Sequence, residues 1–397
     1  MNRNKLNIGV IVPQFPSYSE TFFLSQVTGL CQRGHRVFVF CNSENEDQAL
    51  KKSFQLSQYS NLQIISLHFK LFNIFTWIKF FFQSLFFIHK MRFYKGSLKN
   101  FLFMNLCQVY FEKYKCAIYH FGYSGTAVSY LPIIHSLKGK SIVSCRGTAE
   151  NVKPLSEPGR GAHLKELFAK IDKVHCVSNS MLETIKRYDA PFQKIFINRP
   201  AVDISYFSRK TEFQASEQVR ILSIGRLVFQ KGFMIGLLAM REFKKMFTNF
   251  EWIIVGDGPE DEELLFNINL AGLHPHVKLI GRKTRDQVRE LYESTDIFFL
   301  PSVSEGIANV VLEAMAMEIP VVASLAGGIR EVITDNINGL LCENYDYQAM
   351  ADALHVLSMD FNKRKCLGKK GRKTIEESFS LDRYIEVFEQ QYYELIS

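Results

Sequence analysis

The chain has 397 residues, of which 47% are hydrophobic and 22% are charged. This length allows two domains of ordinary size, and this composition excludes an intrinsically disordered or fibrous protein. The eight cysteines are scattered, without a CxxC pair or a cluster with histidine. They therefore indicate reduced, buried thiols and no metal site.

The net charge of +8 comes from the first part of the chain. Residues 1–110 hold twelve Lys and Arg against four Asp and Glu, a difference that accounts for the whole net charge. A basic surface can bind nucleic acid, an acidic polymer or an anionic membrane. The basic start leads into a short apolar run that ends at Pro13, which is unlike a cleavable signal peptide. We therefore expect a cytoplasmic protein, with a peripheral position on the inner face of the plasma membrane as a second location.

Short β-branched runs alternate with longer amphipathic segments along the whole chain. This pattern predicts parallel sheets covered by helices, which is the α/β class. The predicted strands of the first half are 6–12, 35–41, 116–121, 140–145 and 173–178. Those of the second half are 219–225, 250–256, 277–281, 296–301 and 320–324. We predict two α/β domains, 1–203 and 204–380, with the final amphipathic segment 381–397 packed back on the first.

The segment 71–88, LFNIFTWIKFFFQSLFFI, is rich in Phe. As a helix it would be apolar nearly all round, with one narrow polar stripe. A membrane span is excluded, because it would put the strands of a single sheet on opposite sides of a bilayer. Two alternatives remain. The helix either packs on the N-terminal sheet, or lies at a membrane interface where basic residues of 70–100 meet anionic lipid.

The strongest functional signal is SEGIANVVLEAMAMEIPVVAS, residues 304–324. Glu305 follows a predicted strand and should lie at a loop tip, and Glu313 should lie in the first turns of the next helix. The N–H groups at a helix start favour anions, and carboxylates can accept hydrogen bonds from hydroxyls. We infer that the two carboxylates hold two parts of one polyol ligand. The alternative is that Glu305 caps the helix and Glu313 is a solvated surface residue.

Two further loops follow predicted strands of the second half. GRLVFQKG, residues 225–232, places Arg226 and Lys231 as fixed cations at the sheet edge, where they suit a diphosphate. VGDGPE, residues 255–260, is a strand-to-helix turn with two glycines. Each motif by itself is also compatible with an ordinary surface loop.

As a set, these motifs resemble the retaining group 1 (GT4) glycosyltransferases. The shared features of the second half are GRLxxxKG, GxGPE, a strand that ends in FFLPS, the E-x7-E pair and GGIRE at 327–331. In the first half, QFPSYSETFFLSQ (14–26), YHFGYSG (119–125) and SCRGT (144–148) are similar to a subgroup that builds exopolysaccharides such as colanic acid. The resemblance implies the GT-B architecture, in which two Rossmann-like domains face each other across a cleft. The N-terminal domain would bind the acceptor and the C-terminal domain the nucleotide-sugar donor.

The resemblance also implies roles for single residues. Arg226 and Lys231 would bind the donor diphosphate. Glu313 would hold the ribose hydroxyls, and Glu305 the hydroxyls of the transferred sugar. His120 would face that sugar from the first half, at a position where many relatives carry two histidines and this chain reads Tyr-His-Phe. Further donor contacts are implied for Ser19, Glu20, Gly225, Gly256, Gly258, Gly281, Arg282, Gly306, Ile307, Ala308 and Asn309.

The implied reaction moves a hexosyl unit, with retention of configuration, to a lipid-linked saccharide in surface polysaccharide biosynthesis. Fixed cations can stabilise the leaving diphosphate. The sequence also has no DxD motif, so we expect no metal. We also expect no other cofactor, and no nucleic acid partner, because the charged donor motifs of the second half would then be a coincidence. The alternatives are a sugar phosphorylase or epimerase of the same fold, and a non-catalytic basic protein that binds nucleic acid or membrane. A nicotinamide dehydrogenase is disfavoured, because the first strand-to-helix turn, VPQFPSYSET, lacks GxGxxG.

Overall fold

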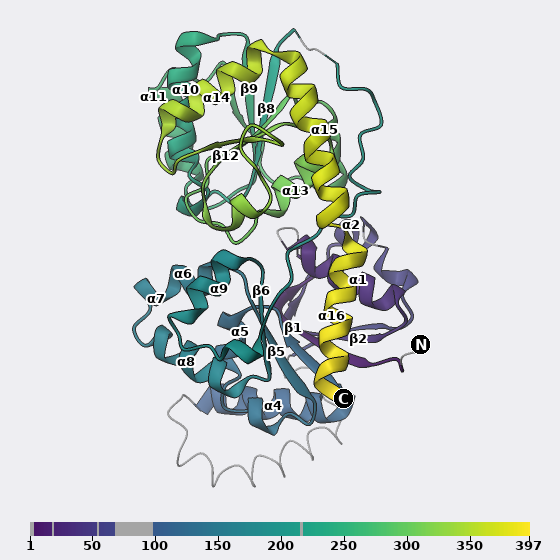
Figure 1. Cartoon of the computed structure of the whole chain (residues 1–397). Helices are drawn as coiled ribbons and strands as arrows, with labels where there is room; N and C mark the ends of the chain where they lie inside the picture. Colours follow the sequence, from purple (N-terminus) through teal and green to yellow (C-terminus); the bar gives the residue numbers. More distant parts are fainter. Residues whose placement is uncertain (1–3, 18–19, 54, 68–97, 215–216) are drawn as a thin grey trace. The chain divides into compact units, whose positions relative to one another are not determined.

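The structure is a computed structural model that describes residues 4–17, 20–53, 55–67, 98–214 and 217–397. The chain forms two compact units (Figure 1). The first unit comprises Met1–Cys176, Leu182–Ile197 and Val387–Ser397, and the second comprises Val177–Met181 and Asn198–Glu386. The Phe-rich segment 71–88 lies outside the described residues, so both interpretations of it stay predictions. No helix within the described ranges combines the length and hydrophobicity of a membrane span.

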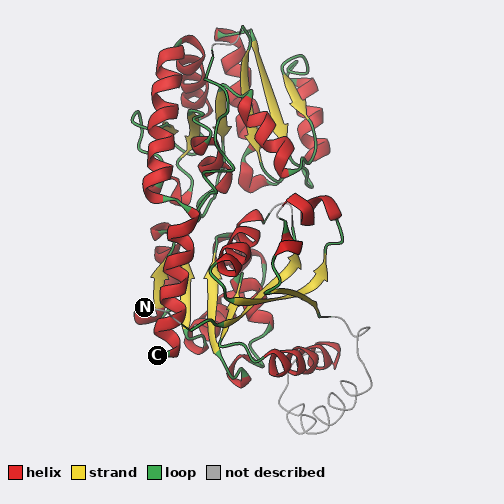
Figure 2. Cartoon of the chain, turned by 90° about the vertical axis from the view of Figure 1, so that its right-hand side faces the viewer, coloured by secondary structure: helices red, strands yellow, loops and turns green. Residues whose placement is uncertain are grey.

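The first unit is built on one parallel sheet (Figure 2). Its seven described strands lie in the order β3-β2-β1-β4-β5-β6-β7. Their bounds are β1 Asn7–Phe15, β2 Arg36–Glu44, β3 Leu62–Ser66, β4 Ile118–Phe121, β5 Lys140–Cys145, β6 Lys173–Cys176 and β7 Ile195–Ile197. The described helices are α1 Thr21–Gln32, α2 Gln48–Ser53, α4 Leu98–Tyr114, α5 Ser124–Ser129, α6 Thr148–Asn151, α7 Lys153–Ser156, α8 Arg160–Lys170 and α9 Asn179–Lys186. The central strands are apolar on both faces, as expected for a sheet that helices cover on both sides.

The second unit repeats this plan. Its six described strands are also parallel and lie in the order β10-β9-β8-β11-β12-β13. Their bounds are β8 Val219–Ile224, β9 Phe250–Val255, β10 Val277–Leu279, β11 Ile297–Leu300, β12 Val321–Ser324 and β13 Leu340–Cys342. The helices are α10 Phe233–Met246, α11 Asp261–Leu270, α12 Arg285–Glu293, α13 Asn309–Ala316, α14 Tyr347–Met359, α15 Phe361–Ser378 and α16 Leu381–Ile396, the last of which continues into the first unit.

A buried hydrogen-bond chain ties three strands of the second sheet together. The Nε1 of Trp252 on β9 donates to Oγ of Ser223 on β8 at 2.8 Å, and that hydroxyl donates to the carbonyl of Phe299 on β11 at 2.6 Å. All three side chains are fully buried. Because buried donors need partners, this chain lets a Trp indole enter the core beside the two central strands.

Each sheet has one place where the strand order reverses. In the first sheet it lies between β1 and β4, and in the second between β8 and β11. At such a point the connections leave the sheet in opposite directions, which opens a space at the carboxyl ends of the two strands. Most of the motifs that we selected from the sequence follow these four strands or their neighbours.

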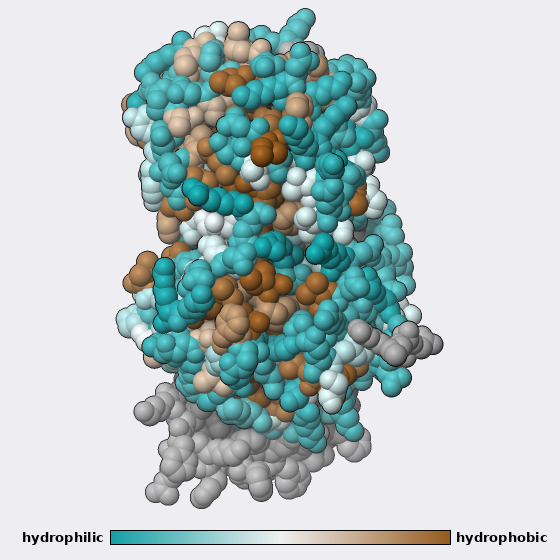
Figure 3. Space-filling model, viewed as in Figure 1, coloured by the Kyte–Doolittle hydropathy of each residue, from teal (hydrophilic) through white to brown (hydrophobic). Residues whose placement is uncertain are grey.

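Large apolar side chains also remain on the surface. In the first unit Leu155 is 87% exposed and Phe192 is 73% exposed. In the second unit Phe266 and Leu270 on α11 are 66% and 74% exposed. On the face drawn in Figure 3, hydrophobic side chains lie among hydrophilic ones in both units. Scattered exposure of this kind is normal for a folded protein.

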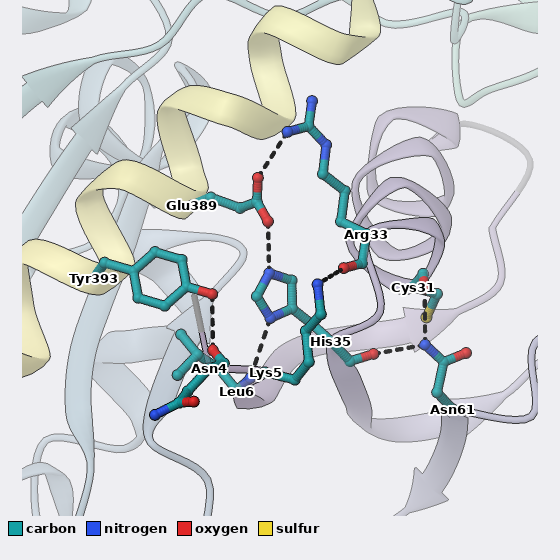
Figure 4. A network of polar contacts seen from close by, with 9 residues as sticks. All are labelled: Asn4, Lys5, Leu6, Cys31, Arg33, His35, Asn61, Glu389 and Tyr393. Atoms are coloured by element: carbon teal, nitrogen blue, oxygen red, sulfur yellow. Dashed lines mark hydrogen bonds and ion pairs between the residues drawn. The ribbon is translucent and has the colours of Figure 1, made fainter. Parts of the chain in front are cut away.

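The last part of α16 is attached to the first unit by a polar network (Figure 4). The carboxylate of Glu389 lies between Arg33 and His35 and accepts from both, at 2.9 Å from Arg33 Nη1 and 2.7 Å from His35 Nε2. One turn further along, the hydroxyl of Tyr393 donates to the carbonyl of Asn4 at 2.9 Å. The RGH segment after α1 is therefore an attachment point for a helix at the far end of the sequence.

The protonation state of His35 follows from its partners. The backbone N–H of Leu6 donates to Nδ1 of His35 at 3.2 Å, so Nδ1 is an acceptor and the proton sits on Nε2, facing Glu389. The imidazole is fully buried, and burial lowers its pKa. The segment around it is held further by Asn61, whose amide donates to the carbonyls of Cys31 and His35 (Figure 4). A neutral His35 therefore joins β1, β2 and α16.

We expect Glu389→Ala to lower the free energy of unfolding by about 1–3 kcal/mol, because it leaves the buried Nε2–H of His35 without an acceptor. Glu389→Gln should cost less, since an amide oxygen can still accept from His35. Midpoints of urea denaturation, followed by near-ultraviolet circular dichroism, would measure both changes. Glu386→Ala, at an exposed position of the same helix, is the matched control. Equal midpoints for Glu389→Ala and the control would contradict the proposed role of the network.

Candidate functional site

Backbone hydrogen bonds hold together the loops after β8, β9 and β10. Gly225 N donates to Val255 O, Leu227 N to Asp257 O and Gly256 N to Gly281 O, at 2.8–3.0 Å. Gly256 has a φ of +141°, and a Cβ at this position would lie 1.9 Å from the carbonyl oxygen of Gly225. A side chain at Gly256 would therefore push the two loops apart, so the first glycine of GDGPE is needed for loop packing.

Lys231 and Glu305 form an ion pair at the carboxyl edge of β8 and β11. Lys231 Nζ lies 2.6 Å from Glu305 Oε1, and the hydroxyl of Ser302 donates to the same oxygen at 2.7 Å. The side chains of Lys231 and Glu305 are 19% and 11% exposed. The stem of Lys231 packs against Gly225, where a Cβ would lie 3.2 Å from it. Two residues that lie 74 positions apart are thus brought together at the switch point.

The GGIRE segment supports the backbone of Glu305. Gly327 has a φ of +58°, and a Cβ there would lie 1.8 Å from the carbonyl oxygen of Glu305. Only a glycine allows this approach, because both the conformation and the space exclude a side chain. The loop after β12 therefore packs directly against the backbone of Glu305 and supports it.

Glu313 lies on α13 and is partly buried. Its carboxylate interacts with the neutral hydroxyl of Tyr292 and with the positive charge of Arg285. The fully buried phenol of Tyr292 on α12 donates to Glu313 Oε2 at 3.1 Å. Burial raises the pKa of Glu313 to about 7, while the Tyr292 hydrogen bond and the charge of Arg285 act in the opposite direction. The carboxylate is consequently easy to protonate near neutral pH, unlike an ordinary surface glutamate.

Arg285 is held beside this carboxylate by aromatic rings. Its guanidinium carbon lies 3.6 Å from the ring centroid of Tyr206 and 5.4 Å from that of Phe207. Its Nη2 lies 3.8 Å from Oδ2 of Asp203. Burial lowers the pKa of Arg285. Stacking of this kind holds a guanidinium in a fixed orientation.

The other predicted residues of the second unit occupy the same sheet edge. Arg226 is exposed and forms no ion pair or side-chain hydrogen bond with the described residues. Arg282 pairs with Asp257 at 2.5 Å, and Gly281 takes a φ of +66°. Gly258 packs directly against Leu227. The segment that leads into α13 is buried over Gly306, Ile307 and Ala308 and precedes Asn309, the first residue of the helix.

Among the predicted residues of the first unit, His120 is buried, unlike the exposed Arg226 of the second unit. The side chain of His120 is 1% exposed and points into the unit. Its Nδ1 lies 2.7 Å from the hydroxyl of Tyr392 on α16, and its Nε2 lies 2.8 Å from Oγ of Ser144 on β5. Burial lowers the pKa of His120 well below its usual value. The expected contact of His120 with a sugar stays a prediction, as does that of Glu20, which precedes α1. Ser19 lies outside the described residues.

Tyr292, Arg285 and Ser302 were not selected from the sequence. Tyr292 and Arg285 lie in the amphipathic segment RDQVRELYE, in which nothing distinguishes them from ordinary helix residues. Ser302 was visible as the last letter of FFLPS, but its hydroxyl contact with Glu305 was not. Within the described ranges, no group of three or more His, Cys, Asp or Glu side chains is placed to hold a metal ion.

The geometry offers two carboxylates, an ammonium and the exposed guanidinium of Arg226 on one sheet edge. The carboxylates can accept hydrogen bonds from hydroxyl groups, and the cations can bind phosphate oxygens. The arrangement suits a ligand that carries both kinds of group, such as a sugar joined to a phosphate.

Two family models match the chain one after the other. Glycosyltransferase Family 4 matches residues 19–206, and Glycosyl transferases group 1 matches residues 207–374. WcaL of Escherichia coli strain K12, a glycosyltransferase assigned to colanic acid biosynthesis, is 25% identical over 94% of this chain and 96% of its own length. The amylovoran biosynthesis glycosyltransferase AmsK of Erwinia amylovora is 31% identical over 60% of either chain.

A comparison with solved structures agrees with the family models. The structure of Anabaena HepE in complex with UDP-glucose matches 98% of this chain and 100% of its own, with a TM-score of 0.76 at 14% identity. At that identity the likeness shows the fold alone. Taken together, these findings establish that the chain belongs to the group 1 (GT4) glycosyltransferases, has the GT-B fold, and is related to enzymes of exopolysaccharide biosynthesis.

Proposed function

We propose that this enzyme transfers a hexosyl unit from a nucleoside diphosphate sugar, with retention of configuration and without a metal ion, to a lipid-linked saccharide. The observation that carries the proposal is the Lys231–Glu305 pair at the switch point of the second sheet, with Ser302 on the same carboxylate oxygen. A cation and a hydrogen-bonded carboxylate at this edge suit the phosphate and the hydroxyls of one donor. That the HepE structure holds UDP-glucose supports a nucleotide-sugar donor.

The proposed donor site divides the work among four residues. Arg226 and Lys231 bind the diphosphate, Glu305 positions the hydroxyls of the transferred sugar, and Glu313 accepts from the ribose hydroxyls. When donor enters, the ammonium of Lys231 exchanges part of its contact with Glu305 for phosphate oxygens. Neither residue is thus left as a buried, unpaired ion before or after binding, which would be energetically costly.

The chemical step breaks the bond between the anomeric carbon and the diphosphate oxygen. An acceptor hydroxyl forms the new bond on the same face of the sugar, and its proton passes to the departing phosphate oxygen. Negative charge grows on the diphosphate as the bond breaks, so the fixed charges of Arg226 and Lys231 lower the barrier. Glu305 holds the sugar and forms no covalent bond.

The donor proposal can be tested directly by thermal denaturation with a panel of nucleotide sugars, in the presence of EDTA. A ligand that binds only the folded protein raises the melting temperature with its concentration. We expect at least one nucleoside diphosphate sugar to do so. An unchanged melting temperature with every nucleotide sugar of the panel, at high concentration, would contradict the proposal. Stabilisation that occurs only when Mg²⁺ is added in place of EDTA would contradict the proposal that the enzyme works without a metal ion.

Glu313→Gln should weaken binding of the nucleotide sugar by roughly 1–3 kcal/mol, about 5- to 150-fold, because a charged acceptor for the ribose is lost. The parent protein should also lose donor affinity as the pH falls from 8 to 6, since Glu313, with a pKa of about 7, takes up a proton in this range. The variant should lack this pH dependence. Isothermal titration calorimetry at several pH values would measure both effects, and parallel pH profiles for parent and variant would argue against the ribose role.

Arg226→Ala should reduce kcat by about a hundredfold or more, by analogy with the loss of one group that stabilises transition-state charge. Its effect on stability should be small, because Arg226 is exposed. Arg241→Ala on α10, another exposed arginine of the second unit, is the matched control. Assays of sugar transfer would measure turnover, and normal turnover of Arg226→Ala would remove this residue from the diphosphate site.

The stereochemical part of the proposal has its own test. Proton NMR of the product formed from an α-linked nucleotide sugar should show an α linkage at the transferred sugar. A β linkage would show inversion, which would require another catalytic arrangement while leaving the donor contacts as they are.

A further inference from the structure

Arg146 follows β5 in the first unit and joins three segments that the function so far leaves unused. Its guanidinium carbon lies 4.2 Å from the ring centroid of Phe22 and 4.8 Å from that of Phe23, both on α1. Its Nε donates to the carbonyl of Gly122, directly after β4, at 3.2 Å. These residues belong to the segments QFPSYSETFFLSQ, YHFGYSG and SCRGT. The fold therefore gathers the three N-terminal motifs around one guanidinium.

The charge of Arg146 has no counter-ion among the described residues. Its Nη2 is buried and has no hydrogen-bond partner there. The carboxylate of nearby Glu150 is already occupied, because it accepts from Ser124 Oγ at 2.5 Å and from Gly147 N at 2.9 Å. A buried N–H without an acceptor costs free energy, so an oxyanion at this position would be stabilised.

Aromatic rings surround the guanidinium and hold it in place. Phe22 and Tyr123 are both partly exposed and meet edge to face, with their ring centroids 6.5 Å apart. Phe23 is buried beneath them, and Gly122 leaves it room, since a Cβ there would lie 2.4 Å from the Phe23 ring. A preorganised cation beside partly exposed aromatic faces is a combination that binds a ring-shaped ligand with one anionic group.

The position of the Arg146 cluster in the fold also favours a ligand-binding site. Phe22 and Gly122 follow β1 and β4, the two strands between which the order of the first sheet reverses. Ligands of open parallel sheets bind at the carboxyl ends of such strands. The Arg146 cluster thus occupies in the first sheet the place that Lys231 and Glu305 occupy in the second.

We propose that Arg146 binds an oxyanion of the acceptor, either the carboxylate of a uronic acid or a phosphate linked to the saccharide. The proposal rests on the proposed function, which makes the ligand of the first unit the acceptor. It adds that the acceptor is charged close to the sugar ring that Phe22 and Tyr123 contact. A neutral saccharide would leave Nη2 without a partner and should bind more weakly.

The test compares the parent with Arg146→Gln, Arg146→Lys and the control Arg187→Gln, an exposed arginine of the same unit. Binding of sodium glucuronate, glucose 1-phosphate and glucose would be measured by thermal shift at equal ionic strength. We expect at least one of the two anions to stabilise the parent more than glucose does. This effect should fall at least tenfold in apparent affinity in Arg146→Gln, persist in part in Arg146→Lys, and be unchanged in Arg187→Gln. Glucuronate as the stronger ligand would assign a carboxylate, and glucose 1-phosphate a phosphate.

Equal stabilisation of the parent and Arg146→Gln by both anions would overturn the proposal. If Arg146→Gln does not fold, phenylglyoxal modification of the parent replaces it. The anion that stabilises the parent should then protect the peptide with Arg146, but not the peptide with Arg187, as measured by mass spectrometry. Equal modification of Arg146 with and without the anion would also overturn the proposal.

Nucleotide sugars in the same assay separate this inference from the proposed function. If they stabilise the parent and neither anion does, the acceptor site at Arg146 is wrong and the donor site stands. If an anion binds through Arg146 and no nucleotide sugar binds, the donor site is wrong. Loss of nucleotide-sugar binding in Arg146→Gln, without any effect of the two anions, would assign Arg146 to the donor and overturn the acceptor role.

Discussion

A parallel sheet needs a crossover connection after each strand, and the carboxyl ends of all its strands therefore meet at one edge. In both units of this protein the order of the strands reverses once, between β1 and β4 and between β8 and β11. The connections on either side of that point diverge, so the chain leaves space there without any special loop. Lys231 with Glu305 in one unit, and Arg146 with its aromatic neighbours in the other, depend on this single constraint for their position.

One residue of the proposed donor site also works against the stability of the protein. The pKa of Glu313 rises to about 7 from a usual value of 4.5. Between these two pH values the folded protein keeps a proton that the unfolded chain has lost, so the stability associated with this proton is lost as the pH rises through the window. Above it, the folded protein carries a partly buried carboxylate whose partners are the Tyr292 hydroxyl and the nearby charge of Arg285. Residues kept for ligand binding often carry such a cost.

The sequence predicted the interior of both sheets well and their edges poorly. The strands of each sheet's centre are long apolar runs, and segments such as 140–145 and 219–225 were recognised within a residue or two. β3, β7 and β13 were missed, and all three lie at a sheet edge. Edge strands pair on one side only, so runs as short as IFI and LLC are sufficient there and do not stand out from loops.

The site shows the same division. The motifs and the family resemblance selected Arg226, Lys231 and Glu305, whose loops follow strands, and Glu313 in the helix after them. They could not show that Lys231 and Glu305 pair with each other, or that Tyr292 meets Glu313, since these contacts depend on how helices pack. For His120, the sequence indicated a strand end, but its side chain contacts Tyr392, which comes 272 residues later. Contacts of that separation have no local signature.

The attachment of α16 has a consequence for how the protein is made. Glu389 and Tyr392 fill positions against His35 and His120, which lie 354 and 272 residues earlier in the sequence. A ribosome synthesises β1 to β7 long before it reaches these residues. During that interval the first unit has its strands but lacks the helix that shields its buried histidines, while the second unit has its own sheet in one continuous stretch. The unit that is synthesised first is therefore completed only after the second, and exposed apolar surface makes such incomplete domains prone to aggregate.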